Sequence, residues 1–314
     1  MKPFLSVIVP TYNGERYIAQ ALGSVLREEA KDLEVIVVDD GSDDRSLRIV
    51  DSFASLLPLR TILNSRIGNW VKMSNIGLRE ARGDWVSFLH QDDFWLPGRL
   101  GKVRHAAASA PGALLLHHAL FVDPDGRHIC KWTCPLRAGD IPPQLFLERL
   151  LVQNFIAMPS PVFRRAAALR EGGMDETLWF TPDWDLWLRL GAMGPVRFIG
   201  GEPLAAFRIH MQSQTIAKPV RAGEWRDQLT TVLHRHLDRW AAPSGGGRHH
   251  VARVARASIE VNVTLAAASR GERVHWGPLL SIMIRMGPRD WWRYLRDSRI
   301  VERVRSRLGL RRGT

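Results

Sequence analysis

Short apolar runs alternate with amphipathic segments along the first ninety residues of the chain. The runs have the length and the Val, Ile, Leu and Phe content of buried strands, and they cover residues 5–9, 34–38, 59–63 and 85–89. Between them, apolar side chains recur at every third or fourth position, which predicts a helix after each of the first three strands. This alternation is typical of an α/β fold with a Rossmann-like, mostly parallel sheet flanked by helices.

Polar side chains gather where these predicted strands end. A polar turn begins at Pro10, Asp39 and Asp40 follow the second strand, and Asp92 and Asp93 follow the fourth. The carboxyl ends of parallel strands meet at one edge of a sheet, where open α/β sheets bind their ligands. Two adjacent carboxylates repel each other unless a positive charge lies between them, and a divalent cation with a diphosphate would supply that charge. A strand that simply ends in a polar turn would give the same residues, so both interpretations stay open at this point.

The pattern changes in the middle third of the chain. Short strands are predicted at residues 113–116 and 118–122, a hairpin turn at 123–126 and an amphipathic helix at 141–153. Asp183 then lies in the first turn of an aromatic helix. An acid in the first turn stabilises a helix by about 1 kcal/mol through the helix dipole. Asp183 therefore has a structural explanation that requires no chemical role.

Three regions are expected on this basis. Two halves of one α/β domain, residues 1–110 and 111–220, precede a basic, Trp-containing helical region, residues 221–314. The net charge of the chain is +12, and residues 285–314 alone carry 10 Arg against 3 acidic residues. Trp and Tyr among Arg side chains fit an anchor at an anionic membrane surface, formed by residues 276–314. A helix that packs on the body would have a similar composition, and nucleic-acid binding is not expected because no aromatic stacking motif on a sheet is visible.

Several classes of protein are disfavoured by what the sequence lacks. No G-x-G-x-x-G follows the first predicted strand and no G-x-x-x-x-G-K-[ST] occurs, so we expect neither a dinucleotide site nor a phosphate loop. Cys130 and Cys134 are the only cysteines, and one such pair indicates neither a zinc site nor a disulfide framework. No apolar stretch is long enough for a spanning helix or a signal peptide. We therefore expect a cytoplasmic protein, peripheral at the cytoplasmic face of the membrane if the tail is an anchor.

The order and spacing of five stretches resemble the family 2 inverting glycosyltransferases of the GT-A type. The first half contains SVIVPTYNGERYIAQALGSVL, EVIVVDDGSDD and SNIGLREARGDWVSFLHQDD. The second half adds GGMDETLWFTPDWDLWLRL, which is similar to the acceptor-side motif of the family, and FRIHMQSQT, which is similar to its late His-containing motif. The resemblance covers about residues 4–215. It implies a GT-A fold that binds a nucleotide-sugar, followed by a C-terminal helical extension.

The resemblance also implies roles for particular residues. Asp183 falls on the general base of the family, Asp93 on the acid that coordinates Mg²⁺ or Mn²⁺, and His210 on the late position that closes over the diphosphate or the metal. Asp39 and Asp40 are alternatives for contact with the nucleotide base. The residues implied to bind the substrates are Pro10, Thr11, Tyr12, Asn13, Glu15, Asp39, Asp40, Lys72, Asn75, Asp92 and Trp184.

Three positions depart from the pattern of the family. Gln91 replaces the first acid of the fuller D-x-D motif, which removes one potential metal ligand. The family often carries Arg-Asn ahead of Gly77, where this chain has no Arg, so Lys72 or Arg66 becomes the candidate for contact with phosphate. Pro182 stands where an acid commonly precedes the base, so that support for the base is missing.

The sequence therefore predicts a metal-dependent inverting glycosyltransferase. It would move a sugar from a nucleotide-diphospho-sugar to a hydroxyl of a glycan or a lipid-linked saccharide. Such a transfer needs a cation for the leaving diphosphate and a carboxylate for the proton of the acceptor. A sugar-phosphate nucleotidyltransferase is one alternative, but it would need a Gly-rich loop with Arg and Lys where this chain has PTYNGE. A catalytically idle sugar-nucleotide-binding protein is the other alternative, and the presence of all three key acids argues against it.

Overall fold

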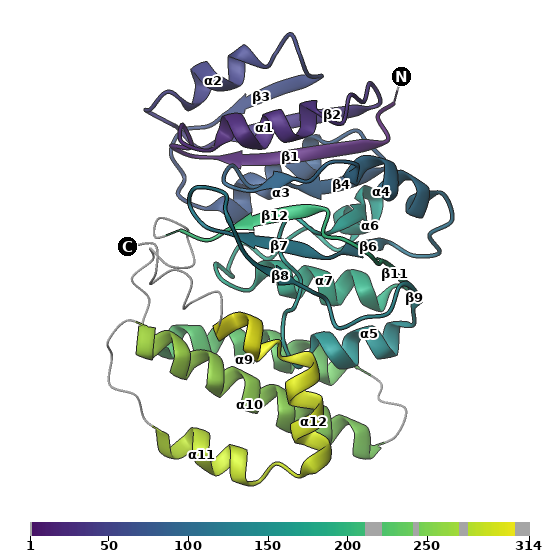
Figure 1. Ribbon diagram of the computed structural model, residues 1–314, viewed down its shortest axis with the longest axis vertical. Coiled ribbons are helices and arrows are strands. Elements are labelled where there is room, and N and C mark those ends of the chain that lie inside the picture. Colours follow the sequence, from purple (N-terminus) through teal and green to yellow (C-terminus); the bar gives the residue numbers. More distant parts are fainter. Residues whose placement is uncertain (1, 211–221, 241–244, 270–275, 305–314) are drawn as a thin grey trace.

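Figure 1 shows the computed structural model of the 314-residue chain, which describes residues 2–210, 222–240, 245–269 and 276–304. Two sheets and the helices around them form the body of the molecule. A layer formed by helices α9 to α12 covers one end of this body, opposite the end at which α2 and β3 lie (Figure 1). The expected α/β architecture with C-terminal helices is therefore confirmed.

The large sheet has the strand order β3-β2-β1-β4-β10-β6-β11-β9. Its strands are β1 Leu5–Thr11, β2 Leu33–Asp39, β3 Leu59–Leu63, β4 Trp85–Phe88, β6 Leu114–His117, β9 Gly139–Ile141, β10 Val162–Arg164 and β11 Val196–Ile199. The pairs β3–β2, β2–β1, β1–β4 and β6–β11 are parallel, and β10 and β9 run antiparallel to their neighbours. The first four strands occupy the four runs predicted from the sequence.

A small sheet and the remaining helices complete the fold. The small sheet has the order β5-β12-β7-β8, with β5 Phe94–Trp95, β7 Ala119–Val122, β8 His128–Trp132 and β12 Ala205–Arg208. The helices of the body are α1 Ile18–Leu26, α2 Ser46–Ser52, α3 Trp70–Glu80, α4 Arg99–Ala108, α5 Pro143–Leu150, α6 Arg165–Arg170 and α7 Pro182–Ala192. The C-terminal helices are α9 Ala222–Arg239, α10 Gly245–Ser269, α11 Trp276–Ile284 and α12 Pro288–Asp297.

The first strand is longer than the sequence predicts. We expected it to break at Pro10, but β1 continues to Thr11 because its pairing with β2 runs as far as Thr11 and Asp39. The pairing of β1 with β4 ends earlier, at Ile8 and Phe88. Proline lacks an N–H donor and is tolerated where a neighbouring strand has already ended. Pro10 lies beyond that end, so it does not interrupt the strand.

The helix predicted over residues 141–153 is shorter than expected. It corresponds to α5, which begins at Pro143. Ile141 belongs to β9 instead, where it pairs with Val196 of β11. Pro142 has an extended backbone conformation at the start of α5, and the proline ring is well suited to a helix start. The apolar pattern continues across the boundary between β9 and α5, so the pattern alone does not reveal where the helix begins.

Both faces of the large sheet are buried. Val7 and Val9 of β1 belong to one apolar cluster, and Ile8 between them belongs to the other, because side chains alternate along a strand. The cluster that contains Ile8 continues through α7 into α9, where Val232 and Leu233 belong to it. The C-terminal helices therefore share a hydrophobic core with the α/β body.

Helix α12 packs on the body, which agrees with the second of the two interpretations of the basic tail. Asp290 of α12 is buried and forms ion pairs with His250 and Arg253 of α10. Arg293 forms a further ion pair with Glu148 of α5. Arg293 is thus engaged by an acid of the protein itself.

Helix α11 presents a different surface. Trp276, Leu280 and Ile284 are 57%, 55% and 82% exposed, and their spacing of four residues places them on one face of the helix. Residues 305–314, which belong to the predicted anchor, lie outside the described residues. Within the described ranges, no helix has the length and apolar character needed to cross a membrane. Membrane association through this region stays a prediction.

Candidate active site

A pocket of about 610 Å³ opens at the carboxyl ends of β1, β2 and β4 and is closed on its other side by α7. Its size is ordinary for a small-molecule site, and its place is the ligand edge of an α/β sheet. The predicted site residues that line it are Pro10, Thr11, Tyr12, Asn13, Asp40, Asp92, Asp183, Trp184 and His210. Side chains that lie more than 170 residues apart in the sequence thus meet in one pocket.

The turn after β2 separates the two acids that were alternatives for contact with a nucleotide base. The carboxylate of Asp39 accepts hydrogen bonds from the backbone N–H of Ser42 at 2.9 Å and from the Ser42 hydroxyl at 2.5 Å. Asp39 is therefore committed to its own turn and does not line the pocket. Asp40 does line the pocket, where it accepts the backbone N–H of Gly68 at 2.8 Å and pairs with Arg66.

Gln91 fastens the turn after β1 to the turn after β4. The backbone N–H of Tyr12 donates to Oε1 of Gln91 at 2.8 Å, and Nε2 of Gln91 donates to the carbonyl of Tyr12 at 3.0 Å. A neutral amide can accept and donate at once, which an ionised carboxylate cannot do. A Cβ at Gly14 would lie 2.5 Å from Oε1 of Gln91, so the glycine is needed for this close approach. The guanidinium of Arg66 stacks 3.6 Å from the ring centroid of Tyr12 and completes this wall.

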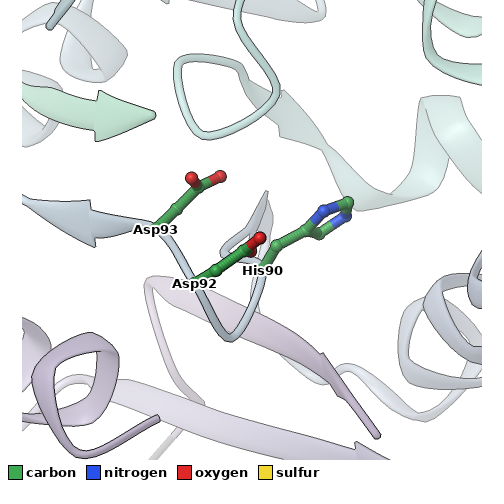
Figure 2. Close-up of side chains that lie close together, drawn as sticks. All are labelled: His90, Asp92 and Asp93. Carbon is green, nitrogen blue, oxygen red and sulfur yellow. The ribbon is translucent and has the colours of Figure 1, made fainter. Parts of the chain in front are cut away.

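The turn after β4 brings three potential metal ligands together (Figure 2). Ligand atoms of His90, Asp92 and Asp93 lie within 4.8 Å of one another. Oδ1 of Asp93 accepts the backbone N–H of Arg208 at 2.9 Å, while the buried Oδ2 has no hydrogen-bond partner among the described residues. Nε2 of His210 lies 2.8 Å from Oδ2 of Asp92. A buried carboxylate oxygen without a partner, next to a second carboxylate, fits a hard divalent cation.

The two carboxyl groups of this turn titrate differently. Burial, together with the neighbouring charge of Asp92, raises the pKa of Asp93 well above its usual value. Burial also opposes ionisation of Asp92, but the hydrogen bond with His210, together with the charges of His90 and His210, outweighs it and lowers the pKa of Asp92. The pair therefore holds one negative charge more easily than two, and a nearby cation would favour the second.

Arg208 holds this turn from behind. Besides its backbone bond to Asp93, its Nε donates to the carbonyl of Asp92 at 2.8 Å. Its Nη1 donates to the carbonyls of Asp123 and Pro124, at 3.1 and 2.8 Å, in the turn between β7 and β8. The side chain is buried and so ties the two sheets together directly behind the acids. We did not predict this contact, because its partners lie at least 84 residues away along the chain.

Asp183 faces the pocket from the opposite side, in the first turn of α7. Nδ2 of Asn154 donates to its Oδ2 at 2.9 Å. Burial raises the pKa of Asp183 to about 6, against the opposing effect of the backbone N–H of Trp184 and of Asn154. A carboxylate with this pKa can act as a general base near neutral pH.

The two tryptophans beside Asp183 differ in position. Trp184 lines the pocket, and its Nε1 donates to the carbonyl of Leu150 at 2.9 Å. Trp187 is fully buried and packs against Phe163 in the core. Trp187 therefore fills the core, whereas Trp184 forms part of the pocket wall.

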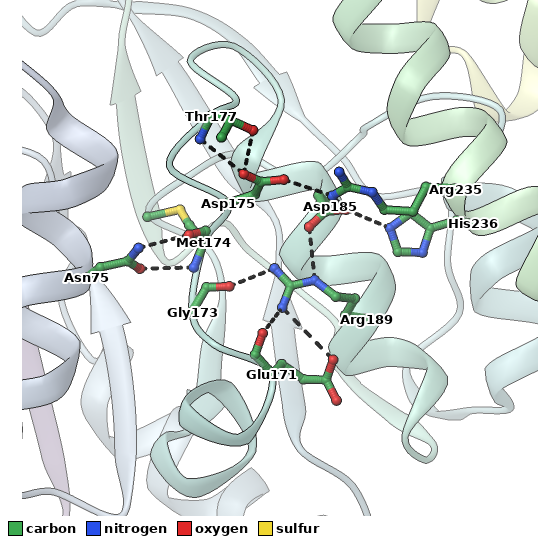
Figure 3. Close-up of polar contacts among 10 residues, drawn as sticks. All are labelled: Asn75, Glu171, Gly173, Met174, Asp175, Thr177, Asp185, Arg189, Arg235 and His236. Carbon is green, nitrogen blue, oxygen red and sulfur yellow. Dashed lines mark hydrogen bonds and ion pairs between the residues drawn. The ribbon is translucent and has the colours of Figure 1, made fainter.

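A buried ion network fixes α7 two residues beyond Asp183 (Figure 3). The carboxylate of Asp185 accepts hydrogen bonds from Arg189, Arg235 and His236, each at 2.9 Å. Burial opposes ionisation of Asp185, but the bond with His236 and the charges of Arg189 and Arg235 outweigh it and lower the pKa of Asp185. Arg235 and His236 belong to α9, so the C-terminal helices help to hold the helix that carries Asp183.

Four predicted substrate-binding residues do not line the pocket, namely Glu15, Asp39, Lys72 and Asn75. The side chain of Asn75 bonds to the backbone N–H and carbonyl of Met174 at 2.9 and 2.8 Å, so it fixes the loop that precedes α7 (Figure 3). Glu15 forms a surface ion pair. Arg66, the alternative to Lys72 for contact with phosphate, does line the pocket.

Two pocket residues, His90 and Asn154, were missed by the sequence reasoning. His90 lies two residues before the acid pair, so its closeness to Asp92 was available as a signal in the sequence. Asn154 carried no such signal. It lies 29 residues from Asp183, in a segment without secondary structure, and only the fold brings them together.

Comparison with known proteins agrees with this fold. The family model described as "Glycosyl transferase family 2" matches residues 6–129. An uncharacterised glycosyltransferase of Haemophilus influenzae is 27% identical over 217 residues, which are 68% of this chain and 71% of that protein. Poly(ribitol-phosphate) beta-N-acetylglucosaminyltransferase TarS of Staphylococcus aureus is 40% identical over 92 residues, 28% of this chain but only 16% of TarS. An uncharacterised glycosyltransferase of Rickettsia typhi is 29% identical, and the match spans 64% of its length.

Solved structures show the same fold. Residues 1–349 of S. aureus TarS, in complex with UDP-GlcNAc, give a TM-score of 0.65 at 19% identity, covering 92% of this chain and 78% of that one. The mannosyltransferase PcManGT from Pyrobaculum calidifontis, in complex with GDP-Man and Mn²⁺, gives 0.54 at 18% identity, covering 98% and 87%.

The fold is that of the glycosyltransferases of the GT-A type. Residues 6–129 match glycosyltransferase family 2, and relatives named as glycosyltransferases align with about two thirds of the chain. The resemblance found in the sequence is thereby confirmed.

Proposed function

We propose that this enzyme transfers a sugar, with inversion at the anomeric carbon, from a nucleotide-diphospho-sugar to a hydroxyl of a glycan or a lipid-linked saccharide. The observation that carries the proposal is the position of acids on opposite sides of one pocket: Asp92 with Asp93 behind it, and Asp183 across from them. Inverting transfer needs this arrangement, because the acceptor oxygen attacks the face opposite the leaving diphosphate. The UDP-GlcNAc and GDP-Man complexes of similar structures support a nucleotide-sugar donor.

The nucleotide would lie against the turns that follow β1 and β2. Tyr12 and Arg66 offer an aromatic and cationic surface there, and Asp40 offers an acceptor for an N–H of the base. Both turns are fixed by hydrogen bonds before any ligand binds. Such preorganisation lowers the entropic cost of binding.

Asp93 is the candidate ligand for a divalent cation, with Asp92 and His90 beside it. Oxygen donors from carboxylates suit Mg²⁺ or Mn²⁺, and the unpaired, buried Oδ2 of Asp93 gains a partner when such an ion binds. The bound cation would neutralise charge on the leaving diphosphate. His210 contacts Asp92, so in this proposal it acts on the site through that carboxylate.

Asp183 is the candidate general base. Asn154 donates to its Oδ2 and so fixes the orientation of the carboxylate that takes the proton of the acceptor hydroxyl. The raised pKa of Asp183, about 6, makes it a stronger base than an ordinary Asp while leaving it mostly ionised at pH 7. Its place in the first turn of α7, anchored through Asp185, gives this carboxylate a fixed direction.

The test compares Asp93→Asn with Asp183→Asn. A thermal-shift screen of sugar nucleotides with Mn²⁺ first identifies the donor, because a ligand that binds the folded state raises its melting temperature. We expect both variants to lose about 10²–10³-fold in turnover. Only Asp93→Asn should lose the Mn²⁺-dependent part of donor affinity. Asp51→Asn, on the exposed side of α2, is the matched control and should keep both properties.

The same assay separates the alternatives. A nucleotidyltransferase would exchange pyrophosphate, and an idle binding protein would bind the donor without releasing nucleoside diphosphate. Full turnover in Asp183→Asn would remove the base from the mechanism. Unchanged Mn²⁺ dependence in Asp93→Asn would remove the metal site.

A further inference from the structure

An aromatic surface lines the pocket on the small sheet, away from the acid pair. Phe121 of β7 and Phe207 of β12 are register partners in neighbouring strands, so their rings project from the same face of the sheet. The ring centroids lie 5.4 Å apart, and both side chains are partly exposed and line the pocket. Together with Trp132 of β8 we call this surface the aromatic wall.

Trp132 holds the aromatic wall in place. Its ring stacks on Phe121 with 4.8 Å between centroids and 9° between planes. Its Nε1 donates to the carbonyl of Phe155 at 2.8 Å, and the side chain is only 5% exposed. Because Trp132 is fixed by both packing and a hydrogen bond, Phe121 is held in one orientation.

The aromatic wall lies next to the candidate base. The carbonyl that accepts from Trp132 belongs to Phe155, and the preceding residue, Asn154, donates to Asp183. Two consecutive residues thus connect the wall with the carboxylate. Gln153, which also lines the pocket, is fixed by a bond of 2.7 Å from Asn262 of α10. The segment between the wall and the base is therefore held from both sides.

Cationic side chains are at the other end of the pocket. Among the described residues that line it, Arg16 and Arg66 are the only Lys or Arg. Arg66 lies over Tyr12, beside the turns proposed to hold the nucleotide, and Arg16 lies over the ring of Tyr17, just before α1. An anionic acceptor such as a phosphate-linked polymer needs Arg or Lys for its phosphates. A neutral sugar ring instead places its C–H face on aromatic rings and its hydroxyls on amides and carboxylates.

We propose that the aromatic wall is an acceptor subsite for a neutral saccharide, whose ring lies on Phe121 and Phe207 with one hydroxyl directed at Asp183. This rests on the proposed function. In the transfer, the hydroxyl oxygen bonds to the anomeric carbon and the bond from that carbon to the diphosphate oxygen breaks. The nucleoside diphosphate leaves with the electron pair, and the hydroxyl proton passes to Asp183. The subsite would distinguish this enzyme from one that acts on poly(ribitol-phosphate).

The experiment measures how acceptor probes change nucleoside diphosphate release by the full chain, with the donor found in the screen. The neutral probes are octyl glycosides of glucose, galactose and N-acetylglucosamine, and the anionic probe is a glycerol-phosphate oligomer. We expect a neutral glycoside to accelerate release and the anionic probe to have no effect. Phe121→Ala and Phe207→Ala should each raise the half-saturating glycoside concentration about tenfold, with donor affinity unchanged.

Two further variants keep the test decisive. Leu120→Ala is the matched control, since Leu120 neighbours Phe121 on β7 but packs in the cluster on the opposite face, and it should leave half-saturation unchanged. Phe121→Leu retains apolar volume if the alanine variant fails to fold, and it should still weaken acceptor binding. Acceleration by the anionic probe alone, no acceleration by any neutral glycoside, or unaltered half-saturation in the Phe variants would overturn the subsite. Absence of donor binding in the unaltered enzyme would instead overturn the proposed function.

Discussion

The donor side and the acceptor side of the pocket hold their polar groups in different ways. On the donor side, hydrogen bonds to backbone groups fix the turns: Asp40 accepts the N–H of Gly68, and Gln91 bonds to both the N–H and the carbonyl of Tyr12. On the acceptor side, the side chain of Asn154 donates to Asp183, and aromatic rings line the pocket around it. In the proposed function, the donor side is thus held by bonds to backbone groups, and the acceptor side is formed by side chains.

The difference extends to what supports each side. The donor turns follow strands of the large sheet directly. The acceptor side depends on α7, which is anchored by Arg235 and His236 of α9 through Asp185. Changes in the C-terminal helices should therefore affect the acceptor side first. The following experiments test this division, beginning with the largest expected effect.

Asp185→Asn should have the largest effect on stability. The substitution leaves Arg189, Arg235 and His236 without their shared carboxylate, and losing one partner of a buried ionic network costs about 3–5 kcal/mol. Urea unfolding measures this change in the free energy of unfolding. Asp84→Asn is the control, because the Asp84 side chain is 58% exposed in its pair with Lys2 and such pairs contribute about 1 kcal/mol or less.

The same network sets a pH dependence. The pKa of Asp185 is lower in the folded protein than its value of about 4 in an unfolded chain. Its contribution to stability is therefore fully present above pH 4 and is lost as the pH falls toward the folded-state pKa. Asp185→Asn should flatten this acid-induced loss. An equal loss in the variant and the unaltered enzyme would show that α7 is not held by this charge.

Asn154→Leu tests the acceptor side without removing a charge. The N–H of Asn154 stabilises the ionised form of Asp183, so its loss should raise the pKa of Asp183 from about 6 by about one unit. Since the base must be ionised, the acidic limb of the turnover profile should move to higher pH by that amount. Donor affinity, measured by calorimetry, should stay the same. A limb that does not move would assign it to another group.

Gln91→Ala is the corresponding change on the donor side. It removes two hydrogen bonds to the backbone of Tyr12. We expect donor binding to weaken by about 1 kcal/mol, the typical contribution of one such bond, so donor affinity should fall about fivefold. The pH profile should not change, because Asp183 is across the pocket. Asn154→Leu should show the opposite result, a shifted acidic limb with unchanged donor affinity. A shift of the acidic limb in Gln91→Ala would contradict the division between the two sides.

The sequence was a better guide to the donor side than to the acceptor side. Asp92 and Asp93 are adjacent in the chain, and the end of a buried strand places them at the ligand edge without further information. Asn154 meets Asp183, and Trp132 meets Phe155, only because α5 and the small sheet pack against α7. Periodicity predicts which face of an element is buried, but it does not predict which buried faces meet.

Local sequence patterns do not distinguish which donor-side residues line the pocket. Asp39 and Asp40 are equivalent as a pattern, and only the turn geometry uses Asp39 for its own backbone while leaving Asp40 in the pocket. Asn75 matched a family motif, yet its amide fixes Met174 in the loop before α7. A polar residue at the correct spacing can thus lie outside the pocket and fix a loop beside it.

The smallest effect is expected at the surface of α11, which faces neither side of the pocket. Trp276, Leu280 and Ile284 are exposed on one face, and interfacial helices bind lipid through such residues next to basic side chains. Changing all three to Ser should reduce cosedimentation with anionic vesicles about two- to threefold while turnover on a soluble acceptor stays unchanged. Leu145→Ser, on the exposed side of α5, is the control. Equal cosedimentation of all three proteins would refute the anchor, because α12 is already held by α10 through Asp290 and by α5 through Arg293.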